Sequence, residues 1–263
     1  MGTDEDKYAL LLQTLKNYSR IAIAFSGGVD STFLLFAAID ALGVKNVLPL
    51  YAATPLHSQA SKNESRRVFS INFPYGKEMD EVKINPLAWQ EVAANGKNRC
   101  YYCKRGLYTS FQRIMAENGY TVLADGTNCN DLEQIRPGLQ AVRELQVATP
   151  LADVGLTKPE IRRLAAGFRL SNHDLPSNSC LATRVSHDIP LSDKILHTIE
   201  LAEDFLHTFG FIGCRVRIYP VHASIEVLEK NIATLVSLPT RTHIQAYFNT
   251  LNLRPVLLSL EGR

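Results

Sequence analysis

The sequence predicts an α/β fold built on a parallel β-sheet, followed by a smaller α+β domain towards the C-terminal end. The first observation is the order of patterns near the start: helical at residues 8–18, an apolar strand at 21–25, a glycine loop at 26–28, a helix at 31–42 and a strand at 47–53. A strand, a helix and a strand in this order form a βαβ unit, which pairs its strands in parallel. Ligands of such sheets bind beyond the carboxyl ends of the strands, where the glycine loop lies. The sequence therefore predicts the place of a binding site before any chemistry is considered.

The second observation is that the α/β alternation continues to about residue 170. A helical pattern at 106–118 precedes a strand pattern at 121–124. A further helix is predicted at 158–167, because Thr157-Lys158-Pro159-Glu160 is typical of a helix start.

The third observation is a change of pattern after the cysteine-containing segment at 176–184. Helices and strands are then predicted at 192–209, 214–219, 224–228 and 240–251. We therefore expect two domains, at residues 1–176 and 177–263.

Composition excludes several classes of protein. With 263 residues, 46% hydrophobic and 21% charged, the chain has the composition of a globular protein. The net charge of +2 disfavours nucleic acid as an obligatory partner. The longest apolar stretch, Phe33–Leu42, contains Asp40 and is shorter than the roughly 20 residues of a membrane span, so no membrane helix is expected. The polar start MGTDEDKY does not resemble a secretory signal, which predicts a cytoplasmic protein.

The segment Ser26-Gly27-Gly28-Val29-Asp30-Ser31 stands between a strand and a helix, where backbone N–H groups and the helix dipole converge on an anion. The two glycines allow close approach to a phosphate, and the serine hydroxyls can donate to its oxygens. Asp30 can hold a magnesium ion that neutralises a polyphosphate. Neither GxxxxGK[ST] nor GxGxxG is present, which disfavours ordinary γ-phosphate chemistry and dinucleotide binding.

Five cysteines, an odd number, favour metal-binding, catalytic or buried thiols over a disulfide framework in a reducing compartment. Cys100 and Cys103 have C-x₂-C spacing, and Cys180 follows later in the chain. Three thiolates suit an iron–sulfur cluster or zinc, whereas a C-x₂-C pair alone also fits two unconnected thiols. Cys129 and Cys214 lie outside these motifs and are interpreted as small buried thiols.

The glycine loop resembles the signature of the PP-loop ATP pyrophosphatases, in which the loop grips the pyrophosphate part of ATP while an acceptor is adenylated. Further blocks stand in the order of the LarE family, and the resemblance runs over most of the chain. These blocks are Asn98–Lys104, Asp125–Asn128, Arg136–Leu139, Pro150–Leu151, Gly155–Arg162 and Cys180–Arg184.

This resemblance implies a PP-loop ATP pyrophosphatase domain and a C-terminal sulfur-transfer and oligomerisation domain. It also implies an ATP-dependent sulfur transferase that converts the carboxylates of pyridinium-3,5-biscarboxylic acid mononucleotide to thiocarboxylates, for a nickel-pincer cofactor. The chemistry is reasonable, because adenylation gives an unreactive carboxylate a good leaving group.

Two sulfur sources are found in that family. In one type, a single cysteine at the position of Cys180 gives up its own sulfur and the protein is spent. In the other, three cysteines hold a [4Fe-4S] cluster whose open iron binds an extra sulfide. Because Cys100, Cys103 and Cys180 are all present, the resemblance implies the cluster type.

Other residues are expected to contact the ligands. Gly126 and Thr127 follow a predicted strand and should border ATP, although a simple turn would look the same. Arg184 is expected to face the substrate phosphate or the leaving AMP.

Arg215 and Arg217 alternate on a predicted strand, which puts both guanidinium groups on one face. They resemble paired arginines of the family that contact the mononucleotide phosphate near a subunit interface. Glu203 resembles an acidic residue that assists sulfur release. A solvated surface charge remains the alternative for all of these charged residues. The resemblance also implies a homo-oligomer, expected to be a hexamer.

The sequence departs from the family pattern at residues 71–76, which bears on the shape of the pocket and not on the use of ATP. Two further departures, at 172–177 and after Arg217, leave a different sulfur acceptor open. A tRNA thiolation enzyme, a PP-loop amide-forming synthetase with incidental cysteines, and a non-catalytic nucleotide-binding or metal-storage protein are the alternatives. The sequence does not identify the sulfide donor.

Overall fold

The computed structural model describes residues 2–74, 78–133, 137–176 and 179–261. Arg136, Ser177 and Asn178, which belong to the motif segments above, lie outside the described residues, as do Tyr75 and Gly76.

The chain divides into two compact units. The first comprises Met1–Thr54, Gln59–Pro86 and Cys100–Asn178, and the second comprises Pro55–Ser58, Leu87–Arg99 and Ser179–Arg263. The stretches Pro55–Ser58 and Leu87–Arg99 therefore belong to the same unit as the C-terminal residues. The two domains predicted from the sequence, with one boundary at 176/177, place both stretches in the first domain.

The first unit is built on a four-stranded sheet with the order β3-β2-β1-β4. All of its neighbouring strands are parallel, and Ile21 pairs with both Val47 and Val122. The strands are β1 (Ile21–Phe25), β2 (Val47–Ala53), β3 (Asp80–Lys83) and β4 (Val122–Asp125). The α/β prediction with a parallel sheet is thus confirmed.

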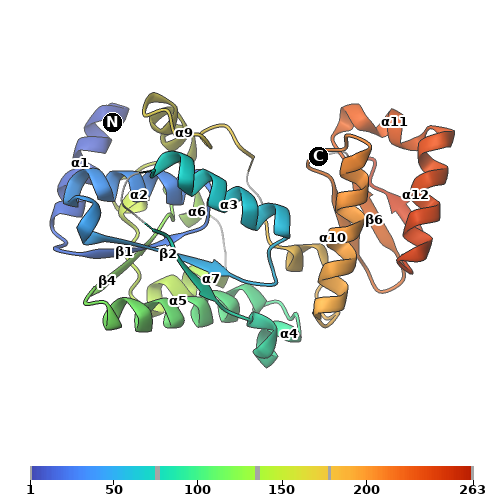
Figure 1. Ribbon diagram of the computed structural model, residues 1–263, viewed down its shortest axis with the longest axis horizontal. Helices are drawn as coiled ribbons and strands as arrows, with labels where there is room; N and C mark the ends of the chain where they lie inside the picture. Colours follow the sequence, from blue (N-terminus) through green and yellow to red (C-terminus); the bar gives the residue numbers. More distant parts are fainter. Residues whose placement is uncertain (1, 75–77, 134–136, 177–178, 262–263) are drawn as a thin grey trace. The chain divides into compact units, whose positions relative to one another are not determined.

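Helices cover both faces of this sheet (Figure 1). Ile21 and Ile23 point to one face and Ala22 and Ala24 to the other, so that two separate apolar cores form. The first face is covered by α1 (Asp4–Lys16), α2 (Val29–Leu42), α3 (Gln59–Asn72) and α9 (Lys158–Gly167). The second face is covered by α5 (Arg99–Glu117) and α7 (Pro137–Glu144). Short helices α6 (Cys129–Leu132) and α8 (Pro150–Asp153) complete the unit.

The structure gives β1, β2 and α9 the bounds that the sequence predicts. In contrast, α5 begins at Arg99 and not at Gly106, so Cys100 and Cys103 are helical residues. The first two turns of α5 carry no apolar stripe, and polar contacts such as the bond from Tyr101 to Glu144 hold them. The elements α3 and β3 escaped prediction because both are predominantly polar.

The second unit has a three-stranded sheet with the order β5-β6-β7, in which β5 and β6 are antiparallel and β6 and β7 are parallel. Its strands are β5 (Arg215–Ile218), β6 (Ala223–Glu226) and β7 (Val256–Leu258), and its helices are α4 (Gln90–Ala93), α10 (Asp193–Thr208), α11 (Ile232–Val236) and α12 (Leu238–Thr250). Phe211, Val216, Ile225 and Phe248 lie in its apolar core. None of the helices in the described ranges is sufficiently long and apolar to cross a membrane.

Candidate functional site

In the glycine loop between β1 and α2, the backbone conformation and the surroundings of Gly27 exclude any other residue. Gly27 has φ +79°, and a Cβ there would lie 2.5 Å from the Ser65 Oγ atom and 2.8 Å from the Ser65 Cα atom. Gly28 is the N-cap of α2, so the loop leads directly into the N-terminal end of that helix. The loop therefore presents backbone N–H groups at a helix start, as an anion site requires.

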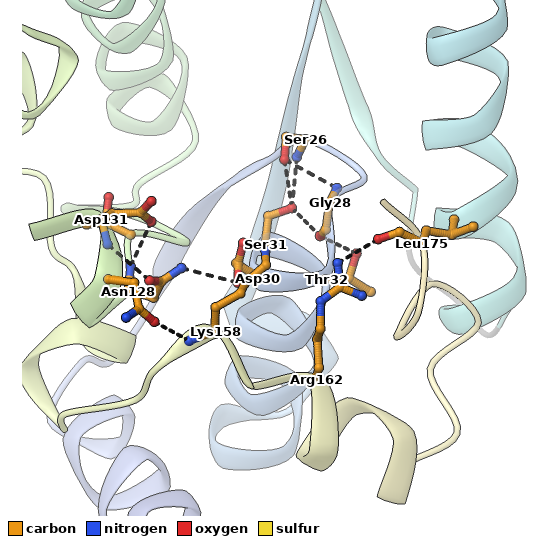
Figure 2. Close-up of polar contacts among 12 residues, drawn as sticks. Ser26, Gly28, Asp30, Ser31, Thr32, Asn128, Asp131, Lys158, Arg162 and Leu175 are labelled. Atoms are coloured by element: carbon orange, nitrogen blue, oxygen red, sulfur yellow. Dashed lines mark hydrogen bonds and ion pairs between the residues drawn. The ribbon is translucent and has the colours of Figure 1, made fainter. Parts of the chain in front are cut away.

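Neutral side chains fix this loop (Figure 2). The Ser31 Oγ atom accepts a hydrogen bond from the Ser26 N–H group at 3.1 Å and donates to the Gly28 carbonyl at 3.0 Å. Thr32 also donates to the Gly28 carbonyl at 3.0 Å. Asn172 donates to the Gly27 carbonyl at 2.8 Å. The protein's own donors thus organise the loop, and Asn172 is a supporting residue that sequence reasoning missed.

Asp30 lies in the first turn of α2 and forms an ion pair with Lys158 at the start of α9. Its second carboxylate oxygen is 3.4 Å from the amide nitrogen of Asn128. Burial raises the pKa of Asp30, and this effect outweighs the opposing effect of the Lys158 ammonium group. The helix dipole disfavours a cation in the first turn of a helix. The position of Lys158 in the sequence therefore indicated that an acidic partner or an anion lies nearby.

A pocket of about 250 Å³ lies beside this ion pair. It sits at the carboxyl ends of β1 and β4, where the direction in which strands are added to the sheet reverses. Its lining residues are Ala24, Ser26, Asp30, Ser31, Lys104, Tyr108, Asp125, Gly126, Thr127 and Asp131. The structure thus brings five of the predicted nucleotide-binding residues to one place.

Asp125 lines this pocket and is 4% exposed. Its carboxylate accepts hydrogen bonds from the Lys104 Nζ atom at 2.9 Å, the Tyr108 hydroxyl at 2.8 Å and the Thr127 N–H group at 3.0 Å. Burial alone would raise the pKa of Asp125, but these donors outweigh it and hold the pKa below its usual value. Asp125 is therefore a buried anion that positions Lys104, and neither residue was predicted to belong to the site.

Gly126 allows β4 and α2 to approach each other at this pocket. A Cβ on Gly126 would lie 2.8 Å from the Ser31 nitrogen and 3.0 Å from the Asp30 carbonyl carbon. A side chain there would push against the backbone at the start of α2.

This set of groups fits a nucleoside triphosphate with magnesium. The helix start and the ammonium groups of Lys104 and Lys158 supply positive charge for phosphates. The carboxylates of Asp30 and Asp131 are oxygen ligands of the kind that Mg²⁺ prefers.

The second unit holds the third motif cysteine. Cys180 directly precedes a short 3-10 helix, Leu181–Arg184. Arg184 is 5% exposed, and its guanidinium group donates to Glu203 at 3.1 Å and to the Ser179 carbonyl at 3.0 Å. Glu203, on α10, also accepts from the Val216 N–H group at 3.0 Å. Both charged residues are therefore buried partners, and their predicted roles toward the substrate stay predictions.

Arg215 and Arg217 lie on one face of β5, on either side of buried Val216. The Arg217 guanidinium group forms an ion pair with Glu226 and donates to the Thr183 carbonyl at 2.9 Å. Cys214 is 3% exposed, as a small buried thiol should be, and Cys129 is half-buried.

Cys100 and Cys103 lie in the first turns of α5 in the first unit, where Cys100 is exposed and Cys103 is half-buried. Cys180, in the second unit, is half-buried. Within residues 2–74, 78–133, 137–176 and 179–261, no three or more His, Cys, Asp or Glu side chains are gathered so that they could hold a metal ion. Because the three cysteines belong to two different units, the three-thiolate metal site stays a prediction.

A parallel sheet with a glycine–serine loop, an acidic residue and lysines at its switch point defines an ATP-dependent enzyme of the PP-loop superfamily. The chain belongs to the LarE family within it. It is 30% identical over 262 residues to the pyridinium-3,5-bisthiocarboxylic acid mononucleotide synthase of Lactiplantibacillus plantarum, and the match covers 100% of this chain and 93% of the relative.

Two further relatives match the chain over different lengths. An uncharacterized protein of Synechocystis sp. is 31% identical over 259 residues, covering 98% of this chain and 95% of that protein. The tRNA(Ile)-lysidine synthase of Persephonella marina is 30% identical over 131 residues, which is 46% of this chain and 28% of that enzyme. No family model matches the chain.

Proposed function

We propose that the protein uses ATP to convert the carboxylates of pyridinium-3,5-biscarboxylic acid mononucleotide to thiocarboxylates. The observation that carries this proposal is the pocket where the glycine loop, Asp30 and Lys104 meet. The name of the Lactiplantibacillus plantarum relative supports the choice of substrate.

The first step is adenylation. A carboxylate oxygen of the substrate attacks the α-phosphorus of ATP, the bond between the α- and β-phosphates breaks, and pyrophosphate leaves. The helix start at Gly28 and the ammonium groups of Lys104 and Lys158 would bind the phosphates, and Asp30 would hold Mg²⁺. Because Lys158 forms an ion pair with Asp30, it is the cation best placed to move from that carboxylate to a phosphate.

The second step transfers sulfur. A sulfide attacks the carbonyl carbon of the acyl adenylate, the bond to the AMP oxygen breaks, and AMP leaves as the thiocarboxylate forms. If the Cys180 thiolate attacks instead, the product is a thioester, which releases the thiocarboxylate when the Cβ–Sγ bond of Cys180 breaks with loss of its α-proton and leaves dehydroalanine. The proposed source is the cysteine set Cys100, Cys103 and Cys180, holding a [4Fe-4S] cluster, and their match to the family positions supports it. Arg215 and Arg217 would bind the mononucleotide phosphate in a homo-oligomer, for which a hexamer is the working hypothesis.

Pyrophosphate release tests the first step. Asp30→Asn and Lys158→Met should each lower the rate of pyrophosphate release by about 100-fold, because the first removes the proposed ligand of Mg²⁺ and the second removes a positive charge that would bind the phosphates. Arg163→Met is a matched control from the same helix, since Arg163 is 60% exposed and pairs with Asp4. Full activity of both test variants would contradict the proposed site.

Iron analysis and replacement of Cys180 test the second step. Anaerobically purified protein should contain iron and sulfide, and Cys180→Ala should abolish thiocarboxylate formation while pyrophosphate release continues. A colourless protein that transfers one sulfur per chain, taken from Cys180, would replace the cluster with the sacrificial mechanism. Thiocarboxylate formation by Cys180→Ala would exclude both sources.

A further inference from the structure

We propose that Arg99 is a positioning residue for Cys180, acting through the backbone of the loop that carries the thiol. This inference rests on the proposed function, in which Cys180 supplies or carries the sulfur. Both residues belong to the second unit, as do all of their partners named below.

Arg99 is 6% exposed and does not end in solvent. Its Nη1 atom donates to the Ala182 carbonyl at 2.9 Å and also bonds to the side-chain oxygen of Asn95. The carbonyl that it holds belongs to the second residue after Cys180. Arg99 can therefore set the path of the loop without touching the sulfur atom.

Asn95 fixes the guanidinium group from behind. It is fully buried, with 0% exposure. Its side-chain amide donates to the Ser186 carbonyl at 2.8 Å and to the Ile189 carbonyl at 2.8 Å. The pair Asn95 and Arg99 thus binds backbone carbonyls at three points between Ala182 and Ile189, which leaves little freedom for the segment after Cys180.

Two more arginines bind the same loop. Arg184 donates to the carbonyls of Ser179 at 3.0 Å and Cys180 at 3.4 Å, and Arg217 donates to the Thr183 carbonyl at 2.9 Å. The Leu181 N–H group donates to the Leu56 carbonyl at 2.7 Å. Guanidinium groups thus hold the backbone at Cys180 itself and on both sides of it.

Such an arrangement is costly for a purely structural purpose. A buried guanidinium group loses its hydration, and apolar side chains of similar size often stabilise a fold as well or better. In return, a guanidinium group fixes direction, because its planar donors bind only correctly oriented acceptors. The fixed direction of the Cys180 backbone is the property that sulfur transfer needs, since small misplacements of a reacting group slow a reaction strongly.

Hydrogen exchange on the full chain tests the inference in Arg99→Met and Arg99→Lys. In Arg99→Met, amides of Leu181 to Val185 should exchange at least about tenfold faster, because a charge-assisted bond to the loop is lost. Arg99→Lys keeps one charged donor and should restore most of the protection. Arg113→Met, at a side chain that is 76% exposed, is the matched control and should change nothing.

Two further measurements separate positioning from general stability. Thiocarboxylate formation by Arg99→Met should fall about tenfold with the KM for ATP unchanged, and Arg99→Lys should recover most of it. Alkylation of buried Cys214 should stay slow in every variant, because the core of the unit remains folded.

Unchanged loop exchange in Arg99→Met would overturn the inference. Faster exchange spread equally over α10 and β5 would also overturn it, since that result marks a general loss of stability. If Cys180→Ala retained full turnover, the proposed sulfur source would fail, yet the exchange result would still report on what Arg99 does to the loop.

Discussion

Two loops contain candidate functional residues: the glycine loop between β1 and α2, and the loop that contains Cys180. The side chains that bind their backbone carbonyls are neutral in the first loop and charged in the second. In the glycine loop, hydroxyl groups of Ser31 and Thr32 and the amide of Asn172 bind the backbone carbonyls. In the Cys180 loop, guanidinium groups of Arg99 and Arg184 bind them. A loop held by neutral groups leaves nearby cations available for a ligand, whereas a loop held by cations uses them for its own shape.

This contrast indicates which cationic side chains can bind a ligand phosphate. In the first unit the lysines that face the loop are paired with Asp30 and Asp125, and a phosphate can compete for them. In the second unit, Arg184 is fully engaged inside the protein with Glu203 and the loop. An arginine of a sequence motif can thus bind the backbone of its own loop instead of a ligand. Three changes, one in the glycine loop and two at ion pairs of the two units, test this comparison.

The largest effect is expected from Gly27→Ala. The added Cβ would lie 2.5 Å from the Ser65 Oγ atom at a residue with φ +79°, so the glycine loop must change shape. Pyrophosphate release should fall by at least about 100-fold, because the loop no longer fits the phosphates.

Gly43→Ala is the control for backbone strain. Gly43 has φ +77°, but no atom of the described residues comes within 4 Å of the point that a Cβ would occupy, so the variant carries strain without a clash. With ψ 153° this backbone conformation is almost exclusive to glycine, so the variant should lose about 1–3 kcal/mol of unfolding free energy and keep normal pyrophosphate release. Equal activity losses in the two variants would mean that strain, and not the shape of the glycine loop, is responsible.

An intermediate effect is expected from Glu203→Ala. This change leaves Arg184 buried without its carboxylate partner, so the free energy of unfolding should fall by about 3–5 kcal/mol. Glu64→Ala breaks the exposed pair with Arg67 and should change stability little. Denaturant unfolding measures both, and a small effect at Glu203 would show that the second unit does not depend on this ion pair.

The smallest effect is expected from Glu160→Gln in the first unit. Burial raises the pKa of Glu160, but hydrogen bonds from Lys7 and Thr157 outweigh it and lower the pKa from 4.5 to about 2. A carboxyl group whose pKa is lowered by folding stabilises the protein above the unfolded pKa, and this contribution is lost as the pH falls through the folded pKa. The variant should be less stable by about 1.5–3 kcal/mol at neutral pH.

The pH dependence provides the check. The difference in unfolding free energy between Glu160→Gln and the natural chain should shrink as the pH is lowered from about 5 to about 2. A difference that stays constant over this range would show that the charge of Glu160 does not contribute.

Sequence patterns predicted the first part of the fold well because its signals are local. The apolar runs of β1 and β2 and the glycines between β1 and α2 can each be recognised without knowledge of the rest of the chain. The polar edge strand β3 has no such signal, since only its pairing with β2 makes it a strand.

The site shows the same limit. Ser26, Asp30 and Ser31 were predicted because they stand in one motif, but Lys158 and Asp125 reach that motif only through tertiary structure. Arg184 and Glu203 were chosen as candidate residues from the sequence, yet no pattern of single residues reveals that they bind each other.

The helix α5 also bears on how such an enzyme can change during evolution. Its anchors Lys104 and Tyr108 are bound to Asp125, whereas Cys100 is exposed and Cys103 only half-buried. Replacing these two thiols would remove little buried apolar surface and would leave the anchors in place. A lineage can therefore gain or lose the pair, and with it the proposed cluster source of sulfur, while the scaffold is inherited unchanged.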